Sequence, residues 1–451
     1  MPADYDLVIL GGTLEGRMAA TRAVGYGARV ALVEVPGLFE RNQQQRYLLQ
    51  GLQQLGRGLQ QQGVGQLFGL GCAEGKAAGG GLNWAALLEW SAIAAQTQCA
   101  HLSADAMSAG GIDVIFEVPE RLSRKMVVTT ASRRLRSRGI IAAYGLSTDV
   151  FDDLLKAQTL PNIVEIWVGG ERSVQWAEAL SALGAQVLLK TATVLPGWDD
   201  AIQGLVRSQL IAKGVQFVEP DAPNSKPPQA DVTLKFGTEQ SALRLPQWIQ
   251  SNGRQADDCL EPALTVNRKL QTRHPRVFAC GAVLGSSSNA SLAQYEVKIA
   301  LANALFLSKN QVDYSALVHG NCQFARVGCT EVQARKQYGP DIRSWQAMSA
   351  NSTDLSRAVP QSSYCKLVCL GDRLVGVHLY GEGANDWATS LASAIGQSIT
   401  SLDDFAGNVS NSQSLGGLIA SAVGQAQQRH WQPHAWRRDW AENWFNWRRN
   451  R

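Results

Sequence analysis

Residues 6–34 constrain the fold more than any other stretch of this 451-residue chain. An apolar run from Leu7 to Leu10 leads into a glycine-rich turn. Small residues follow, and a second apolar run ends at Glu34. This order predicts a strand, a tight turn, a helix and a second parallel strand, which is how a doubly wound α/β fold begins.

The same turn has the composition of a dinucleotide-binding site. The first glycine makes the tight turn, the last lets helix and strand pack closely, and the helix N-terminus is able to receive a pyrophosphate. The acid at the end of the second strand is placed to hold ribose hydroxyls. The match is partial, because Thr13 replaces the middle glycine and Glu15 adds a carboxylate where a phosphate would sit. The candidate cofactor-binding residues are Gly11, Gly12, Thr13, Gly16 and Glu34.

A second unit of the same kind begins after residue 160. An apolar strand over 164–168 leads into a glycine turn, and a helix over 175–183 and a further strand follow. Glu171 replaces the middle glycine. Lys190 ends the second strand, where an NAD-binding unit carries an acid, and a lysine there favours the 2′-phosphate of NADP(H). The candidate nucleotide-binding residues are Gly169, Gly170 and Lys190.

The charge distribution argues against a nucleic-acid-binding body. The formal net charge is +4, and residues 429–451 alone hold six arginines against Asp439 and Glu442. The rest of the chain is balanced and offers no basic stripe. No run approaches the roughly 20 apolar residues of a bilayer span, and the first residues do not resemble a signal segment. We therefore expect a cytoplasmic protein.

The eight cysteines are scattered, and none forms a CxxC pair, so we expect neither a zinc site nor a disulfide framework. Cys365 and Cys369 lie on an alternating stretch. If that stretch is a strand, they are about 13 Å apart at roughly 3.3 Å per residue, too far to bridge. Most of the eight are expected to be buried small hydrophobes.

Two further segments have helical periodicity. In the glutamine-rich stretch after Glu34, four leucines recur at helical spacing: Leu48, Leu52, Leu55 and Leu59. In the tail, four tryptophans fall on one helix face and arginines flank that face. Such a helix suits docking into a partner's groove, lying on an anionic membrane surface, or packing on its own dimer. The tryptophans are Trp436, Trp440, Trp444 and Trp447.

Four motifs appear in a fixed order after the first unit. They are Leu195-Pro-Gly-Trp-Asp, Val277-Phe-Ala-Cys-Gly-Ala-Val, Val327-Gly-Cys-Thr-Glu331 and Leu374-Val-Gly-Val-His378. Together with the two nucleotide-binding units, this order resembles the FAD- and NAD(P)H-dependent pyridine nucleotide-disulfide oxidoreductases, the group of dihydrolipoamide dehydrogenase, glutathione reductase and mercuric reductase.

The resemblance implies an α/β architecture in which an NAD(P) domain interrupts a Rossmann-like FAD domain, and a C-terminal α+β domain forms a homodimer. It also implies FAD and NADP(H) as cofactors, and adds Gly145, Gly281 and Ala282 to the candidate cofactor-binding residues. The expected domains are 1–148 (FAD, first part), 149–250 (NAD(P)), 251–310 (FAD, second part), 311–425 (dimer interface) and 426–451 (tail helix).

The chain departs from the family where the family does its chemistry. The redox cysteine pair should follow Glu34 closely, but no cysteine precedes Cys72. A thiolate is the nucleophile in disulfide exchange, and glutamine or leucine cannot replace it. The family's His–Glu pair aligns with Asn408 and Gln413, which carry no titratable proton, and Ala282 replaces the acid that takes a ribityl hydroxyl. No catalytic residue or metal ligand is assigned.

Two hypotheses from different classes follow. The chain is either a flavin enzyme that moves electrons from NAD(P)H to a non-thiol acceptor, such as a quinone or a metal centre, or a non-catalytic dimeric scaffold that uses its tail to bind a partner or membrane surface. In both cases we predict no disulfide reductase activity.

Overall fold

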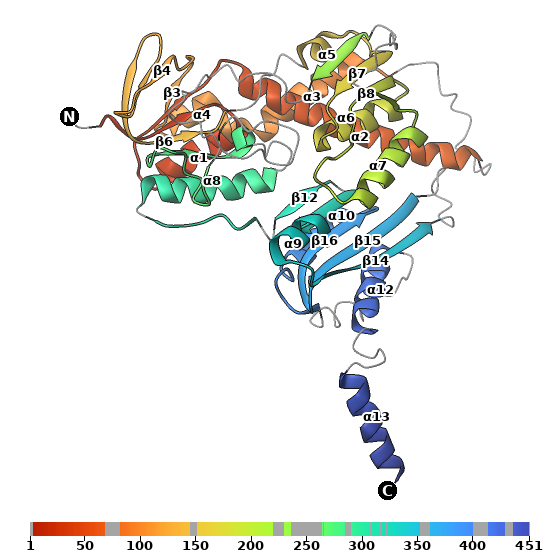
Figure 1. Cartoon of the computed structure of the whole chain (residues 1–451). Helices are drawn as coiled ribbons and strands as arrows, with labels where there is room; N and C mark the ends of the chain where they lie inside the picture. Colours follow the sequence, from red (N-terminus) through yellow and green to blue (C-terminus); the bar gives the residue numbers. More distant parts are fainter. Residues whose placement is uncertain are drawn as a thin grey trace. The chain divides into compact units, whose positions relative to one another are not determined.

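The computed structural model describes most of the chain and shows three sheets with their helices (Figure 1). The description covers residues 3–67, 82–144, 151–219, 230–235, 264, 266–284, 290–306, 308–314, 317–321, 323–351, 361–399, 414–428 and 436–450.

The first sheet has seven strands and contains the N-terminal βαβ unit. Its strands are β1 (Tyr5–Leu10), β2 (Val30–Val33), β3 (Asp113–Ile115), β4 (Arg121–Leu122), β5 (Val127–Thr129), β6 (Arg134–Ala142) and β11 (Val277–Ala279). The order is β3-β2-β1-β6-β5-β4, with β11 also pairing with β6. The strands β3, β2, β1, β6 and β11 run parallel, whereas β4 and β5 add an antiparallel edge.

The central strand of this sheet is a continuous apolar run because both faces of the sheet are buried. Residues 7–10 of β1 are fully buried, as a parallel strand covered on both sides requires. Helices α1 (Leu14–Gly25) and α8 (Ala290–Leu305) pack against one another beside it. The predicted strand–helix–strand order over 6–34 is therefore confirmed.

The glutamine-rich stretch forms one long helix, α2 (Leu38–Leu67). Leu48 and Leu52 are fully buried, as the periodicity predicted, whereas Leu55 is 39% exposed. Helix α3 (Trp84–Gln98) packs against α2, and a Cβ at Gly51 would come within 2.8 Å of the Trp90 ring. A short 3-10 turn, η1 (Ala100–Leu102), and α4 (Ala104–Ala109) return the chain to β3.

The second sheet is the four-stranded parallel sheet of the second nucleotide-binding unit, in the order β10-β7-β8-β9. The predicted glycine turn after β7 is shorter than the sequence suggested. Its helix begins at Glu171 rather than near residue 175, because Gly170 already has the extended backbone of an N-cap. The elements are α5 (Asp152–Lys156), β7 (Ile163–Trp167), α6 (Glu171–Ala182), β8 (Gln186–Lys190), α7 (Asp200–Ala212), β9 (Gln216–Val218) and β10 (Val232–Lys235).

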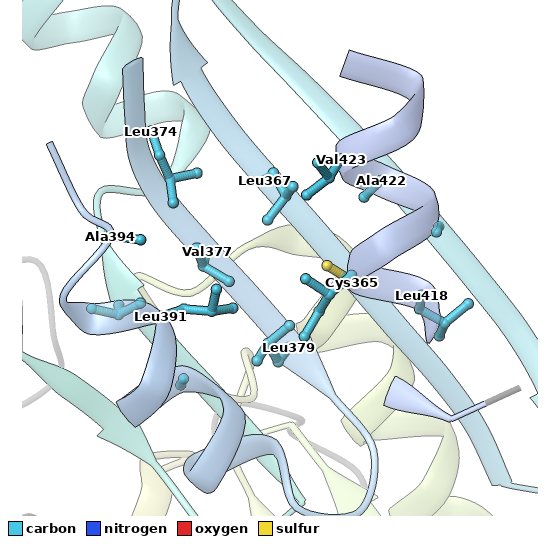
Figure 2. Packing of buried hydrophobic residues seen from close by; sticks show 14 of the residues in the cluster. Cys365, Leu367, Leu374, Val377, Leu379, Leu391, Ala394, Leu418, Ala422 and Val423 are labelled. Carbon is cyan, nitrogen blue, oxygen red and sulfur yellow. The ribbon is translucent and has the colours of Figure 1, made fainter. Parts of the chain in front are cut away.

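The third sheet is antiparallel and has the order β12-β13-β16-β15-β14. One face is covered by α10 and α12, whose leucines and alanines meet the apolar side chains of β15 and β16 (Figure 2). The elements are β12 (Val318–Gly320), β13 (Phe324–Gly328), α9 (Glu331–Tyr338), β14 (Ile342–Asn351), β15 (Gln361–Leu370), β16 (Arg373–Tyr380), α10 (Ala384–Ala392) and α12 (Leu415–Gln428).

The chain divides into two compact units. Unit 1 comprises Met1–Pro196 and Arg207–Val312, and unit 2 comprises Gly197–Val206 and Asp313–Arg451. Unit 1 holds the two Rossmann-like sheets, and unit 2 holds the α+β domain with the predicted tail helix, α13 (Trp436–Arg449). Among the described helices, none has the length and apolarity needed to cross a bilayer.

Candidate functional site

The first glycine turn has the close contacts that make glycine necessary. Gly11 has φ +112°, and a Cβ there would overlap the backbone of Ala143 and Tyr144 after β6. A Cβ at Gly16 would overlap the carbonyl oxygen of Gly11, so α1 can pack directly on the turn. These two positions hold the N-terminus of α1 at the carboxyl end of β1, where parallel α/β sheets bind ligands.

Thr13 serves as the N-cap of α1. Its hydroxyl accepts a hydrogen bond from the Gly16 N–H at 3.2 Å and donates one to the carbonyl oxygen of Ala143 at 2.6 Å. The threonine thus satisfies one of the amides that a bound phosphate would otherwise use. Its side chain takes the place where the sequence pattern expects a bare backbone.

Glu34 follows β2, as predicted, and is engaged by an arginine that the sequence analysis did not single out. Arg17 on α1 donates from Nε to one carboxylate oxygen at 3.0 Å and from Nη2 to the other at 2.6 Å. Both side chains are only 1% exposed. The remaining Arg17 nitrogen donates to the carbonyl oxygen of Leu102 at 2.9 Å, and its guanidinium lies 3.8 Å from the ring centre of Phe39.

The burial of this pair has two consequences. Burial raises the pKa of Glu34, and the hydrogen bonds and charge of Arg17 oppose that rise without cancelling it. The carboxylate also lies directly over Gly12, whose missing Cβ would overlap Glu34 Oε2. A ribose hydroxyl therefore reaches Glu34 only when this carboxylate is uncovered.

Further carboxylates lie near the turn after β11. A Cβ at Gly281 would be 2.8 Å from Cγ of Glu15, which belongs to the first turn of α1. The buried carboxylate of Glu296 accepts a hydrogen bond from the Gly281 N–H at 2.7 Å. Ala282 follows Gly281 in η3 (Gly281–Leu284), and its methyl side chain offers no acceptor. An anion approaching the α1 N-terminus therefore meets acidic neighbours.

The first site thus fits FAD in its framework. The tight turn, the α1 N-terminus and the carboxylate after β2 are each where a dinucleotide needs them. Three features limit that fit: the self-capping threonine, the carboxylate of Glu15 beside Gly281, and the Arg17 guanidinium that already occupies Glu34.

The second glycine turn is crowded at Gly169, where a Cβ would overlap the carbonyl oxygen of Thr193, and open at Gly170. The space where a Cβ of Gly170 would stand has no described atom within 4 Å, and Gly170, the N-cap of α6, has no side chain to cap the helix. The hydroxyl of Ser173, in the first turn of α6, is buried and has no hydrogen-bond partner among the described residues. The backbone before the turn is strained, because Val168, a β-branched residue, has φ +73°. An uncapped helix N-terminus with a buried hydroxyl fits a nucleotide phosphate.

Lys190 stands at the end of β8, as predicted, but its charge is already paired. Its ammonium lies 2.8 Å from a carboxylate oxygen of Glu165 on β7 and 4.7 Å from the ring centre of Trp167. The indole N–H of Trp167 donates to the same carboxylate. A 2′-phosphate would compete with Glu165 for this lysine.

The described cysteines are poor nucleophiles. Burial raises the pKa of the Cys99, Cys280, Cys329 and Cys365 thiols, and raises that of Cys369 to about 12. All five are free thiols. Cys365 and Cys369 lie on the single strand β15, as predicted. Helix α2, which follows Glu34 where the resemblance places the redox pair, contains no cysteine.

A second charged cluster lies within unit 2. The Lys366 ammonium is 2.7 Å from a carboxylate oxygen of Asp199 and 2.9 Å from one of Glu331. Burial raises the pKa of Glu331, but hydrogen bonds from Lys366, Arg335 and Ser344 outweigh it and lower the pKa to about 2. Nearby, the buried ring of His378 donates from Nε2 to the Cys329 carbonyl oxygen at 3.1 Å.

The sequence missed Arg17 and Glu296, although each carried a weak signal as a charged residue inside a run of small or apolar residues. The expected site residue Gly145, the stray Cys72, and the altered positions Asn408 and Gln413 lie outside the described residues.

Comparison with known proteins gives a consistent result. Residues 314–413 match the family model described as the pyridine nucleotide-disulphide oxidoreductase dimerisation domain. A dihydrolipoyl dehydrogenase of Bacillus subtilis is 25% identical over 442 residues, covering 86% of this chain and 90% of the relative. A glutathione reductase of a Nostoc species is 22% identical, covering 89% of this chain and 96% of the relative.

Solved structures give the same fold. The HOCl-induced flavoprotein disulfide reductase RclA from Escherichia coli aligns with a TM-score of 0.69 at 17% identity, covering 93% of this chain and 99% of that one. Together with the family model, these similarities agree with the two Rossmann-like domains and the C-terminal α+β domain described above.

Proposed function

We propose that this chain, which belongs to the pyridine nucleotide-disulfide oxidoreductase family, is a homodimeric flavoprotein that passes electrons from NAD(P)H to an acceptor other than a disulfide. The observation that carries the proposal is the state of the thiols. The described cysteines include no adjacent redox pair, and each has a raised pKa, while each glycine turn leads from a parallel strand into the N-terminus of a helix.

When bound, FAD would supply two-electron redox chemistry through its flavin ring. At the first turn, the N-terminus of α1 and Glu34 would hold its pyrophosphate and adenosine ribose. At the second turn, the uncapped N-terminus of α6 and the hydroxyl of Ser173 would hold the pyrophosphate of the nicotinamide nucleotide. Lys190 would bind a 2′-phosphate after leaving Glu165, which favours NADPH over NADH.

The acceptor is then a group that takes electrons from a reduced flavin without a thiolate, a quinone being the simplest class. Disulfide exchange needs an ionised sulfur. Burial raises the pKa of the Cys99 and Cys329 thiols, which leaves little thiolate at neutral pH for disulfide exchange and supports an acceptor of another kind. Because NAD(P)H is an intracellular reductant, we place this activity in the cytoplasm.

The experiment is NADPH oxidation by purified protein that shows the visible absorbance of flavin, with 1,4-benzoquinone compared against lipoamide and glutathione disulfide. Turnover with the quinone and background rates with both disulfides support the proposal. The matched control is Cys72→Ser, which should leave the quinone rate unchanged. Disulfide turnover that disappears in Cys72→Ser would show that this thiol is a redox group and would overturn the proposal.

A second candidate is a non-catalytic dimeric scaffold that binds through its tail. The specific observation in its favour is that Glu34 is already covered by Arg17 and that Glu15 lies beside Gly281. This candidate is selected if the purified protein is a dimer that has no visible flavin absorbance, either as isolated or after incubation with FAD.

A further inference from the structure

Helix α13 carries a continuous aromatic strip on one face. Trp440 and Trp444 are stacked with ring centres 6.0 Å apart and planes 6° apart, and Trp444 and Trp447 are stacked at 4.9 Å and 29°. At about 100° per residue, the three positions fall within roughly 60° of the helix circumference. They are respectively 62%, 44% and 48% exposed. The tryptophans therefore pack on each other and leave much of their surface to solvent.

The rest of this helix is cationic. Arg438, Arg448 and Arg449 are exposed, and the tail from residue 429 carries six arginines against two acids. This surplus equals the net charge of the whole chain, +4. At 100° per residue, Arg448 lies about 80° around the helix from Trp440, and Arg438 and Arg449 lie about 160° and 180° from it, so the arginines stand beside and opposite the strip. A helix with one apolar face and cationic other faces is complementary to an interface of apolar lipid chains and negatively charged headgroups.

The composition of the strip indicates which surface that is. Between residues 436 and 450, tryptophan, phenylalanine and alanine are the only apolar residues, with no leucine, isoleucine, valine or methionine. A helix that fills a dry protein groove places such aliphatic anchors at i, i+3, i+4 and i+7. Tryptophan has an apolar body and an N–H donor, and it prefers the headgroup level of a bilayer. Arginine side chains reach phosphates while their stems stay in apolar surroundings.

We propose that α13 docks the protein on an anionic phospholipid membrane surface, with the strip Trp440–Trp444–Trp447 inserted at the headgroup level and the arginines on lipid phosphates. The helix lies in the plane of the interface and does not cross the bilayer. This inference goes beyond the proposed electron transfer and does not depend on it, because lipid binding is measured without turnover.

The test is co-sedimentation of the full chain with vesicles of phosphatidylcholine mixed with phosphatidylglycerol, compared with vesicles of phosphatidylcholine alone. We expect binding to the anionic vesicles only. The binding should weaken between 0.1 M and 1 M salt, because the screening length falls from about 10 Å to about 3 Å. The substitutions Arg448→Gln and Arg449→Gln should each weaken vesicle binding about fivefold at low salt.

The strip is tested with the double variant Trp440→Ala, Trp444→Ala, which should bind at least about tenfold more weakly. The matched control is Phe445→Ala. Phe445 is 49% exposed on the same helix, but lies about 140° around the helix from Trp440, so its removal should change binding less than twofold. Because these side chains are exposed, none of the substitutions removes part of a core.

Three outcomes overturn the proposal. The first is equal binding to both kinds of vesicle, and the second is a double tryptophan variant that binds as well as the native chain. The third is a native chain that binds no vesicle. If the Trp440→Ala, Trp444→Ala variant then also differs from the native chain in oligomeric state, measured by sedimentation velocity, the tryptophan strip belongs to an interface between copies of this chain.

Discussion

Arg17 and Glu34 are joined by two hydrogen bonds, of 3.0 and 2.6 Å, and both side chains are buried to 99%. One comes from the helix and the other from the strand end of the same βαβ unit. The pair joins α1 to the end of β2 and covers the carboxylate that a dinucleotide would need. The nucleotide-binding framework is therefore present, but a ligand that needs the Glu34 carboxylate has to displace Arg17.

Removing one partner of this pair should be more damaging than removing both. Arg17→Met leaves a buried carboxylate without a partner and should lower the free energy of unfolding by about 3–5 kcal/mol. The double variant Arg17→Met, Glu34→Met should recover most of that loss. Urea denaturation of the two single variants and the double variant measures the cycle. A stability for Arg17→Met equal to that of the native chain would contradict the reading of a buried ion pair.

The carboxylate of Glu15 should weaken flavin binding. Because it lies beside Gly281 at the first turn of α1, it repels an incoming pyrophosphate. Glu15→Gln should therefore bind FAD about three- to tenfold more tightly, corresponding to roughly 1 kcal/mol. Titration of the flavin-free protein followed by FAD fluorescence measures this. Glu34→Gln is the contrasting variant and should bind FAD more weakly, and equal affinities in all three proteins would refute both assignments.

Glu165 should set the nucleotide preference of the second unit. In Glu165→Gln the ammonium of Lys190 loses its ion pair, 2.8 Å in the native chain, and becomes available to a 2′-phosphate. The ratio of NADH to NADPH dissociation constants should rise about fivefold, or roughly 1 kcal/mol. Lys190→Met should abolish the preference, and calorimetric titration with both nucleotides provides the comparison. A ratio that stays the same in Glu165→Gln means that Lys190 does not contact the nucleotide.

The buried His378 should make unit 2 sensitive to mild acid. Burial lowers its pKa from 6.5 to about 4. The unfolded chain therefore binds the proton more readily, so stability is complete above pH 6.5 and falls as the pH drops towards 4. The urea midpoint measured through this window should fall in the native chain and fall less steeply in His378→Leu. Identical slopes would show that another group titrates.

The Glu331 cluster should act at lower pH. Its folded pKa of about 2 lies below the ordinary value of 4.5. Its contribution is therefore present above pH 4.5 and is lost as the pH falls towards 2. Glu331→Gln should cost about 1 kcal/mol at pH 7, and its difference from the native chain should disappear near pH 2. Thermal unfolding at several pH values follows this. A constant difference across the range would assign the effect to packing.

Local sequence patterns were enough to predict several parts of the fold. The apolar run of β1 and the glycines after it predicted the first βαβ unit, because a buried parallel strand and a tight turn each need particular residue types. Leucine spacing predicted α2, and tryptophan spacing predicted the helix at the tail. The order of the later motifs predicted a resemblance to the pyridine nucleotide-disulfide oxidoreductases, and the dimerisation-domain match over residues 314–413 and the similarity to a dihydrolipoyl dehydrogenase support it.

The sequence by itself determined the first βαβ unit, helix α2 with no cysteine in it, and the tail helix, because each depends on residues close together in the chain. Only the tertiary structure decided how the charged residues pair. Arg17 meets Glu34, Glu165 meets Lys190 and Lys366 meets Asp199 because sheet and helix packing brings them within 3 Å across up to 167 residues of chain. No local pattern encodes those distances, since the strength of a charge pair depends on burial and geometry that exist only after folding.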